Sequence, residues 1–295
     1  MQDDTSPRHN VSSTEEPVKG TSERWELDLR PVDVIVFGSQ LAYGTVGTNA
    51  SLPVLTGARL RVATVPTTLL SNLPSYRSVH THTVPSSWLA SALDDLTALG
   101  VAEAAGTICT GYFAAPEQVR VVAEWLRELL AHRPGLRVVV DPTLGDDDVG
   151  AYTDHHVADA LRDQLLPLAN GLTPNLYELD RLLPAHPLRD LDESSLAELA
   201  RGLLGPRGEW VVVTGADLPE RADVTEQVIN LVVTPEDHTV VIEERVDTAA
   251  KGTGDVFAAS LVRELHHGAS IIDATTAAAE EVCRSLRARS VATPG

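Results

Sequence analysis

The chain has 295 residues, which is long enough for one α/β domain with a large buried core. Its formal net charge is −19 at pH 7, and this acidity argues against a nucleic-acid or anionic-membrane partner, because both require positive patches. A phosphorylated small molecule stays compatible with this charge, since backbone N–H groups and a metal ion can hold it.

The sequence begins with a polar, aperiodic stretch over residues 1–30, which we expect to be a disordered tail before one domain over 31–290. Short apolar strands then alternate with helices. Strands are expected over 32–37, 60–65, 105–110, 136–140, 171–173 and 209–213, with a hairpin over 227–242. Helices are expected over 46–57, 86–99, 116–132, 154–168, 194–204, 254–267 and 270–288. We expect Pro66 to end the second strand and to open a long loop over 66–86. The alternation predicts βαβ units and a mainly parallel sheet.

The most informative segment is Lys251-Gly-Thr-Gly-Asp255, at the start of a predicted helix. Glycines before a helix let backbone N–H groups approach an anion, and the helix dipole favours negative charge there. Asp255 would lie beside that anion and could accept the proton of an attacking hydroxyl group, as the base does in phosphoryl transfer. An acidic residue at an ordinary helix start is the alternative interpretation, and this segment alone does not decide between them.

Three further polar segments follow predicted strands, at the edge of the sheet where ligands bind in such folds. Asp141 ends an apolar strand, and acidic residues that include Asp146 follow it, so this loop could hold Mg²⁺ or be a solvated turn. Asn175 and Glu178 lie three apart on an opening helix, where they could face one site or only cap the helix. Ser39 begins a small polar turn after the first strand. Their shared position at one sheet edge is more informative than any single segment.

Several sequence features are absent. Cys109 and Cys283 are the two cysteines, and their wide separation excludes a disulfide framework or a zinc motif. No apolar run approaches the about 18 residues of a membrane helix, and the polar N-terminal segment does not have the pattern of a secretory signal. We therefore expect a cytoplasmic protein without a membrane partner.

Taken together, motifs along most of the chain resemble the pyridoxal kinases of the ribokinase-like superfamily. These motifs are Ser39-Gln-x-x-Tyr-Gly, Val65-Pro-Thr-x-Leu-Leu-Ser-Asn72, Thr110-Gly-Tyr112, Val140-Asp-Pro-x-x-Gly-Asp146, Leu165 to Glu178, and Gly252-Thr-Gly-Asp255. The resemblance implies a three-layer α/β/α sandwich with a mainly parallel central sheet. It also implies Mg²⁺-dependent transfer of the ATP γ-phosphoryl group to the 5′-hydroxyl of a B6 vitamer, which is pyridoxal, pyridoxine or pyridoxamine.

The same resemblance implies roles for individual residues. Asp255 would be the base, with Gly252, Thr253 and Gly254 as the anion hole for the moving phosphoryl group. The vitamer would be contacted by Ser39, Ser75 and Asp255. The ATP side would comprise Asp141, Thr173, Glu178, Thr214, Arg245, Val246 and Thr253, and the Mg²⁺ side Tyr152, Glu178 and Asp146. A homodimer and a bound monovalent cation are further implications.

The chain departs from the family pattern at two places near the expected vitamer pocket. It has Gly47-Thr48-Asn49 where the family usually has a Gly-Asn pair, and Leu73-Pro-Ser75 where many relatives have a Thr or a His. Two other functions stay open, namely a hydroxymethylpyrimidine kinase of thiamine synthesis and a non-catalytic binder of pyridoxal 5′-phosphate or nucleotide. Lys251 lies next to the anion hole, where an auxiliary phosphate contact is one interpretation, although relatives can have an uncharged residue there.

Overall fold

The computed structural model describes residues 26–183, 188, 191–218, 226–246 and 248–291. Most of the expected N-terminal tail, residues 1–25, therefore lies outside the described residues. From Pro31 onward the described chain forms one compact unit. None of the helices in the described ranges is long and apolar enough to cross a membrane.

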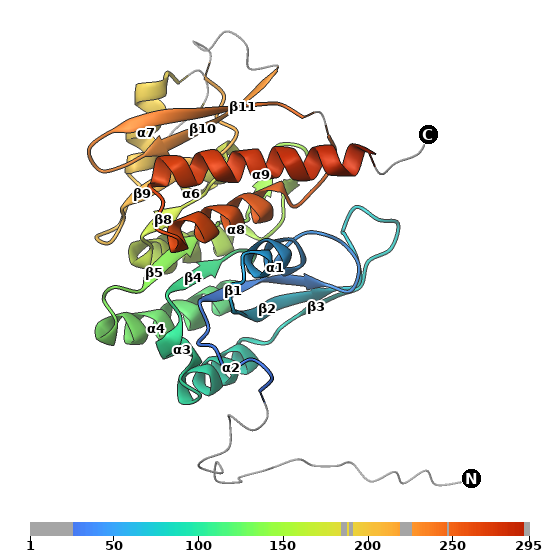
Figure 1. Ribbon diagram of the computed structural model, residues 1–295, viewed down its shortest axis with the longest axis vertical. Coiled ribbons are helices and arrows are strands. Elements are labelled where there is room, and N and C mark those ends of the chain that lie inside the picture. Colours follow the sequence, from blue (N-terminus) through green and yellow to red (C-terminus); the bar gives the residue numbers. More distant parts are fainter. Residues whose placement is uncertain (1–25, 184–187, 189–190, 219–225, 247, 292–295) are drawn as a thin grey trace. The chain divides into compact units, whose positions relative to one another are not determined.

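The centre of this unit is a sheet of nine strands in the order β11-β10-β9-β8-β5-β4-β1-β2-β3 (Figure 1). The strands are β1 (Val34–Leu41), β2 (Val62–Leu70), β3 (Thr81–Thr83), β4 (Thr107–Thr110), β5 (Arg137–Val140), β8 (Gly171–Leu172), β9 (Trp210–Val213), β10 (Gln227–Val233) and β11 (His238–Glu244). The strands from β9 to β2 pair in parallel, and β3, β10 and β11 add antiparallel pairings at the two edges. The predicted mainly parallel sheet is confirmed.

Helices cover both faces of the sheet (Figure 1). One face carries α1 (Thr48–Gly57), α8 (Thr253–His266) and α9 (Ile271–Val291). The other carries α2 (Ser86–Ala98), α3 (Val101–Ala104), α4 (Pro116–His132), α5 (His155–Ala160), α6 (Leu176–Leu182) and α7 (Glu193–Arg201), with α5 continuing as a π turn over Leu161–Leu165 and a 3-10 turn over Leu166–Leu168. In β1, Ile35 and Phe37 pack in one core cluster, whereas Val34 and Val36 pack in the other. Successive side chains of β1 therefore point into the cores on opposite faces of the sheet, which confirms the predicted three-layer α/β/α arrangement.

The prediction that Pro66 ends the second strand is wrong. β2 continues to Leu70, and Thr81–Thr83 forms the edge strand β3, so the expected loop over 66–86 shrinks to the segment between them. The pairing of β1 with β2 shifts register beside the proline, since Gly38 is opposite Pro66 and Ser39 is opposite Thr68. This irregularity accommodates a residue without an N–H group, and the ladder resumes after it.

A small hairpin that the sequence analysis did not predict follows β5. Its strands are β6 (Gly145–Asp146) and β7 (Gly150–Ala151), and acidic residues form the turn between them. A Cβ atom on Gly145 would collide with the carbonyl oxygen of Gly150 and with the ring of Tyr177, so only glycine fits there. The hairpin carries Asp146 and its acidic neighbours to the edge of the site described next.

Candidate functional site

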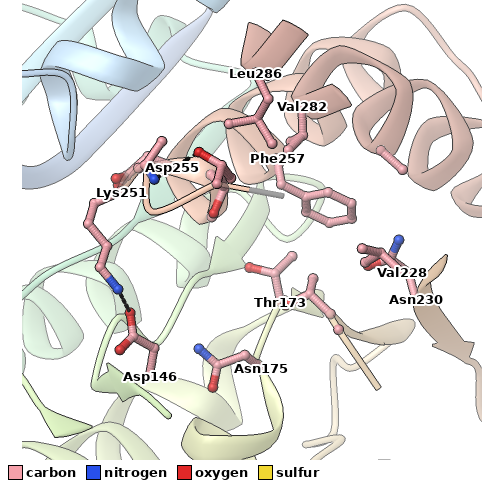
Figure 2. Close-up of a pocket in the computed structure, with 18 of the residues that line it drawn as sticks. Asp146, Thr173, Asn175, Val228, Asn230, Lys251, Asp255, Phe257, Val282 and Leu286 are labelled. Atoms are coloured by element: carbon pink, nitrogen blue, oxygen red, sulfur yellow. Dashed lines mark hydrogen bonds and ion pairs between the residues drawn. The ribbon is translucent and has the colours of Figure 1, made fainter. Parts of the chain in front are cut away.

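A cavity of about 460 Å³ lies at the carboxyl ends of the parallel strands (Figure 2). It is bounded by the β6–β7 hairpin, the start of α8, α9 and the antiparallel strands β10 and β11. The fold brings these predicted residues to its lining: Asp141, Asp146, Tyr152, Thr173, Glu178, Thr214, Arg245, Val246, Gly252, Thr253, Gly254 and Asp255. Polar residues from distant parts of the sequence therefore meet at one edge of the sheet, as predicted.

Two predicted residues do not line this cavity. Ser75 is exposed in the loop after β2, and the structure does not bring it to the other site residues. Ser39 is buried near the end of β1, where its side chain lies so close to Gly47 that a Cβ atom there would collide with it. The N–H of Gly47 donates a hydrogen bond of 2.8 Å to Oδ2 of Asp255. Gly47 therefore contacts both Ser39 and Asp255.

The altered segment after the first strand has a defined structural role. The Thr48 hydroxyl donates a hydrogen bond to the carbonyl oxygen of Ser39 at 3.0 Å. The Asn49 side chain bonds both the N–H and the carbonyl oxygen of Leu41 at 2.9 Å. These contacts fix the turn that carries Gly47, and with it the backbone group that holds Asp255.

The start of α8 forms a cradle with room for an anion. Gly252 has φ of 90°, and a Cβ atom there would collide with the carbonyl oxygen of Thr45, so the position requires glycine. Gly254 is exposed, and a Cβ atom on it would find Asp141 Oδ2 as its nearest neighbour at 3.9 Å. The N–H groups of the first helical turn have no partners within the helix. The open space in front of Gly254 therefore suits a phosphoryl group.

Asp255 has the properties of a base that works near neutral pH. Burial and the negative charge of Asp141 raise its pKa to about 7, although the hydrogen bond from Gly47 acts in the opposite direction. A group with a pKa near the working pH can accept a proton and release it again. Its place in the first turn of α8 brings the carboxyl beside the cradle.

Asp141 and Glu178 form a buried acidic pair. Asp141 accepts hydrogen bonds from the N–H and the hydroxyl of Thr143, at 3.0 and 2.8 Å. Glu178 accepts from the N–H groups of Leu144 and Asn175, both at 2.9 Å. Burial raises the pKa of both carboxyls, and the charge of Asp141 raises that of Glu178 further. Asn175 and Glu178 also form a complete capping box of α6, so the capping interpretation is correct for their local geometry.

These carboxyls fit a hydrated divalent cation. Asp141 raises the pKa of both Glu178 and Asp255, and in the described ranges no basic side chain bonds any of the three. The hydroxyl of Thr173 is buried beside Asp141, where it helps to lower the pKa of that carboxyl. Clustered carboxylates with free lone pairs are the ligands that Mg²⁺ prefers.

The other residues predicted on the metal side are already engaged. Lys251 Nζ lies 2.7 Å from Asp146 Oδ2 (Figure 2). It also lies 3.1 Å from Asp148 Oδ2, and the Tyr152 hydroxyl donates to Asp146. Burial alone would raise the pKa of Asp146, but the bonds from Lys251 and Tyr152 lower it overall. Burial and Asp146 raise the pKa of Tyr152, so this phenol keeps its proton. Asp146 therefore binds Lys251 here, and a metal ion would have to displace that ammonium group.

For the MgATP substrate that the family resemblance implies, replacing Lys251 with methionine is expected to raise the KM by about 3- to 10-fold, with little change in kcat. The substitution keeps the apolar stem but leaves Asp146 and Asp148 without their cation beside an anionic substrate. Steady-state kinetics at low and high salt measure the effect, which should shrink as salt screens the charges. Lys251→Arg is the control and should stay near wild type. A KM for MgATP that is unchanged at both salt concentrations would contradict this role.

The stability of the ligand-free protein is expected to fall as the pH rises from about 4 to about 7. Asp141, Glu178 and Asp255 all have folded-state pKa values raised above their ordinary values, mainly by burial. Over that range the unfolded chain has already released the protons that the folded chain still holds, so each unit of pH favours unfolding. Urea unfolding across this range measures the trend, and Asp255→Asn should flatten it. A stability that rises steadily to pH 7 would contradict the raised pKa values.

The sequence analysis missed the apolar end of the cavity. This end is formed by Val228 and Asn230 of β10, Phe257 of α8, and Val282 and Leu286 of α9 (Figure 2). The predicted site residues follow strand ends, whereas β10 contributes side chains from within the strand. The available signal was a single asparagine between apolar neighbours in that strand.

Comparison with known proteins gives consistent relatives. The model of the phosphomethylpyrimidine kinase family matches residues 43–293. A pyridoxine/pyridoxal/pyridoxamine kinase of Bordetella bronchiseptica is 42% identical over 260 residues, which cover 87% of this chain and 89% of the relative. The pyridoxine kinase of Bacillus subtilis is 29% identical over 182 residues, or 60% of this chain and 62% of that one.

Solved structures with the same fold are also found. The pyridoxal kinase of Leishmania donovani in complex with ADP matches with a TM-score of 0.78 at 25% identity, covering 87% of this chain and 86% of the other. The pyridoxal kinase of Entamoeba histolytica has a TM-score of 0.80 at 22% identity, covering 90% and 91%. These likenesses confirm the predicted ribokinase-like fold.

Proposed function

Since the chain belongs to the pyridoxine/pyridoxal/pyridoxamine kinases of the phosphomethylpyrimidine kinase family, we propose that it transfers the ATP γ-phosphoryl group to the 5′-hydroxyl of a B6 vitamer. The observation that carries this proposal is the position of Asp255. Its carboxyl lies beside the cradle at the start of α8, and it is bonded to Gly47, which lies against Ser39. The base therefore stands between the phosphate side and the expected vitamer side.

The transfer needs one proton acceptor and a stabilised phosphoryl group. Asp255 takes the proton of the 5′-hydroxyl as its oxygen attacks the γ-phosphorus, the bond to the β-phosphate oxygen breaks, and ADP leaves. The N–H groups at Gly252, Thr253 and Gly254 hold the phosphoryl group while its charge is redistributed. Because there is little covalent chemistry for the protein to perform, positioning and electrostatic stabilisation account for most of the rate.

The nucleotide is proposed to lie along the cavity. Thr173 offers a buried hydroxyl beside Asp141, and Thr214, Arg245 and Val246 line the wall where the nucleotide would extend. Asp141 and Glu178 are the residues best placed to hold Mg²⁺, which when bound would neutralise phosphate charge. Participation of Asp146 and Tyr152 would require Lys251 to leave Asp146 first.

A substrate panel tests the proposal. Purified protein is incubated with ATP, Mg²⁺ and each of pyridoxal, pyridoxine, pyridoxamine and hydroxymethylpyrimidine, and ADP release and phosphorylated product are measured. Phosphorylation of any B6 vitamer supports the proposal. The order of preference among the three vitamers then shows which of them is the preferred substrate. Phosphorylation of hydroxymethylpyrimidine alone would replace it with the thiamine-pathway kinase. Binding of vitamer and nucleotide without ADP release would indicate a non-catalytic binder.

Three further implications of the family resemblance are part of the proposal. They are a homodimer, a bound monovalent cation and a cytoplasmic location. Sedimentation equilibrium measures the first, and the dependence of kcat on K⁺ at constant ionic strength measures the second. A monomer with unchanged activity in Na⁺ and K⁺ would contradict both.

A further inference from the structure

Asn230 has an unusual environment for an amide side chain. It lies within β10, opposite Val241 of β11, and only 3% of its surface is exposed. Asparagine fits strands poorly, and a buried amide destabilises the folded state unless it is hydrogen-bonded. Within the described part of the chain, no hydrogen bond joins the Asn230 side chain to another residue, and its amide atoms are not among the fully buried ones but face the cavity. The protein alone therefore gives no reason for an amide at this position.

The surroundings of Asn230 suit a flat ring. Phe257, Val282 and Leu286 line the same end of the cavity from α8 and α9, and Val228 lies beside Asn230 on β10 (Figure 2). The charged pair of Asp146 and Lys251 lies on the opposite side of the view. The cavity therefore has an apolar slot with one amide at one end and a phosphate cradle at the other. These two ends match the base and the phosphates of a nucleoside triphosphate.

We propose that Asn230 reads the base of the phosphoryl donor and selects adenine. This inference rests on the proposed function, in which the cavity holds ATP. A carboxamide presents a donor and an acceptor side by side, and adenine offers the matching pair in its N6 amino group and N7. Guanine and hypoxanthine carry an oxygen at that ring position, so two acceptors would face the amide and one of its groups would stay unpaired.

The test compares ATP with ITP, whose hypoxanthine base differs from adenine at that group. Wild-type protein is expected to use ATP with a kcat/KM about tenfold or more above that for ITP. In Asn230→Leu this preference should fall below about threefold, with the KM for the vitamer unchanged. The ligand-free variant should unfold at the same or a higher temperature, because an apolar side chain of similar size replaces an unbonded amide.

The matched control is Ser260→Ala. Ser260 is buried in α8 and also lacks a hydrogen-bond partner, but it does not line the cavity. It should leave the preference for ATP over ITP unchanged. Equal use of ATP and ITP by the wild type, or a full preference retained in Asn230→Leu, would overturn the assignment. So would a Leu variant that is strongly destabilised while keeping its preference, because that is the behaviour of a structural amide.

The assignment of Asn230 can still be tested if the proposed function fails. If no vitamer is phosphorylated, calorimetric titration with ADP and IDP still compares the two bases in wild type and variant. Should Asn230→Leu not fold, Asn230→Asp serves instead, since a carboxylate keeps the acceptor for the N6 group but loses the donor for N7. A preference reduced to an intermediate value then supports the assignment, and an unchanged one rejects it.

Discussion

An Asp255→Asn protein is expected to lose about 10²- to 10⁴-fold in kcat for phosphorylation of its vitamer. Asparagine is nearly isosteric and its amide oxygen can still accept the hydrogen bond from Gly47, but it cannot take up the hydroxyl proton. Binding of ADP, measured by calorimetry, should change little because the helix start is intact. Single-turnover formation of the phosphorylated vitamer measures the chemical step directly.

The pH dependence provides a second measurement of the same role. With a pKa of about 7, Asp255 of the wild type is protonated at lower pH, so kcat/KM should rise with pH through that region. The residual activity of Asp255→Asn should lack this rise. The variant should also be at least as stable as the wild type above neutral pH, since it removes a carboxylate beside Asp141. Asp180→Asn, at an exposed position in α6, is the control. Near wild-type turnover in Asp255→Asn would refute the assignment of the base.

Gly252→Ala is expected to lower both stability and activity. A left-handed backbone costs an alanine about 1–2 kcal/mol, and the collision with the Thr45 carbonyl oxygen adds to this, for a total of about 2–4 kcal/mol. Relief of the collision would push apart the start of α8 and the turn that carries Gly47, so kcat/KM should fall about 100-fold. Urea unfolding and steady-state kinetics measure the two effects.

Gly100→Ala is the matched control for this substitution. Gly100 also has a positive φ, of 70°, but a Cβ atom there would meet nothing within 4 Å. It therefore reports the backbone strain without a collision and lies outside the cavity lining. If Gly252→Ala proves as mild as Gly100→Ala in both measurements, the close approach of Thr45 to α8 is not essential to the site.

The parallel pairing of the strands, and the edge of the sheet that carries the site, can be predicted from short sequence patterns. Apolar runs such as that before Asp141 identify buried parallel strands, and their polar ends must then gather at one edge. Pro66 misled the prediction because its tolerance depends on a register shift between two strands, which is a property of the pair. The ion pair that Asp146 makes was beyond the sequence for a similar reason. Its partner Lys251 is 105 residues away, and no local rule brings the two together.

Site side chains that do not follow a strand end are harder to predict from the sequence. The expected vitamer contact of Ser75 rests on the family resemblance alone, and a loop does not fix the direction of a side chain as a strand end does. Asn230 gives no signal of its own, because its strand has the pattern of an ordinary apolar run. Its isolation within the core becomes visible only when the neighbours from α8 and α9 are known.

The contact between Gly47 and Asp255 has a consequence for how the enzyme becomes active. These residues are 208 positions apart in the sequence, yet the hydrogen bond between them aligns Asp255, the proposed base, with the turn beside Ser39. Contacts of such long sequence separation form late in folding, after local helices and neighbouring strands. A chain in which α8 has not yet docked would lack Asp255 at this position, so it could not carry out the proposed transfer. Recovery of activity during refolding should therefore coincide with the slowest structural phase, with no partially active intermediate before it.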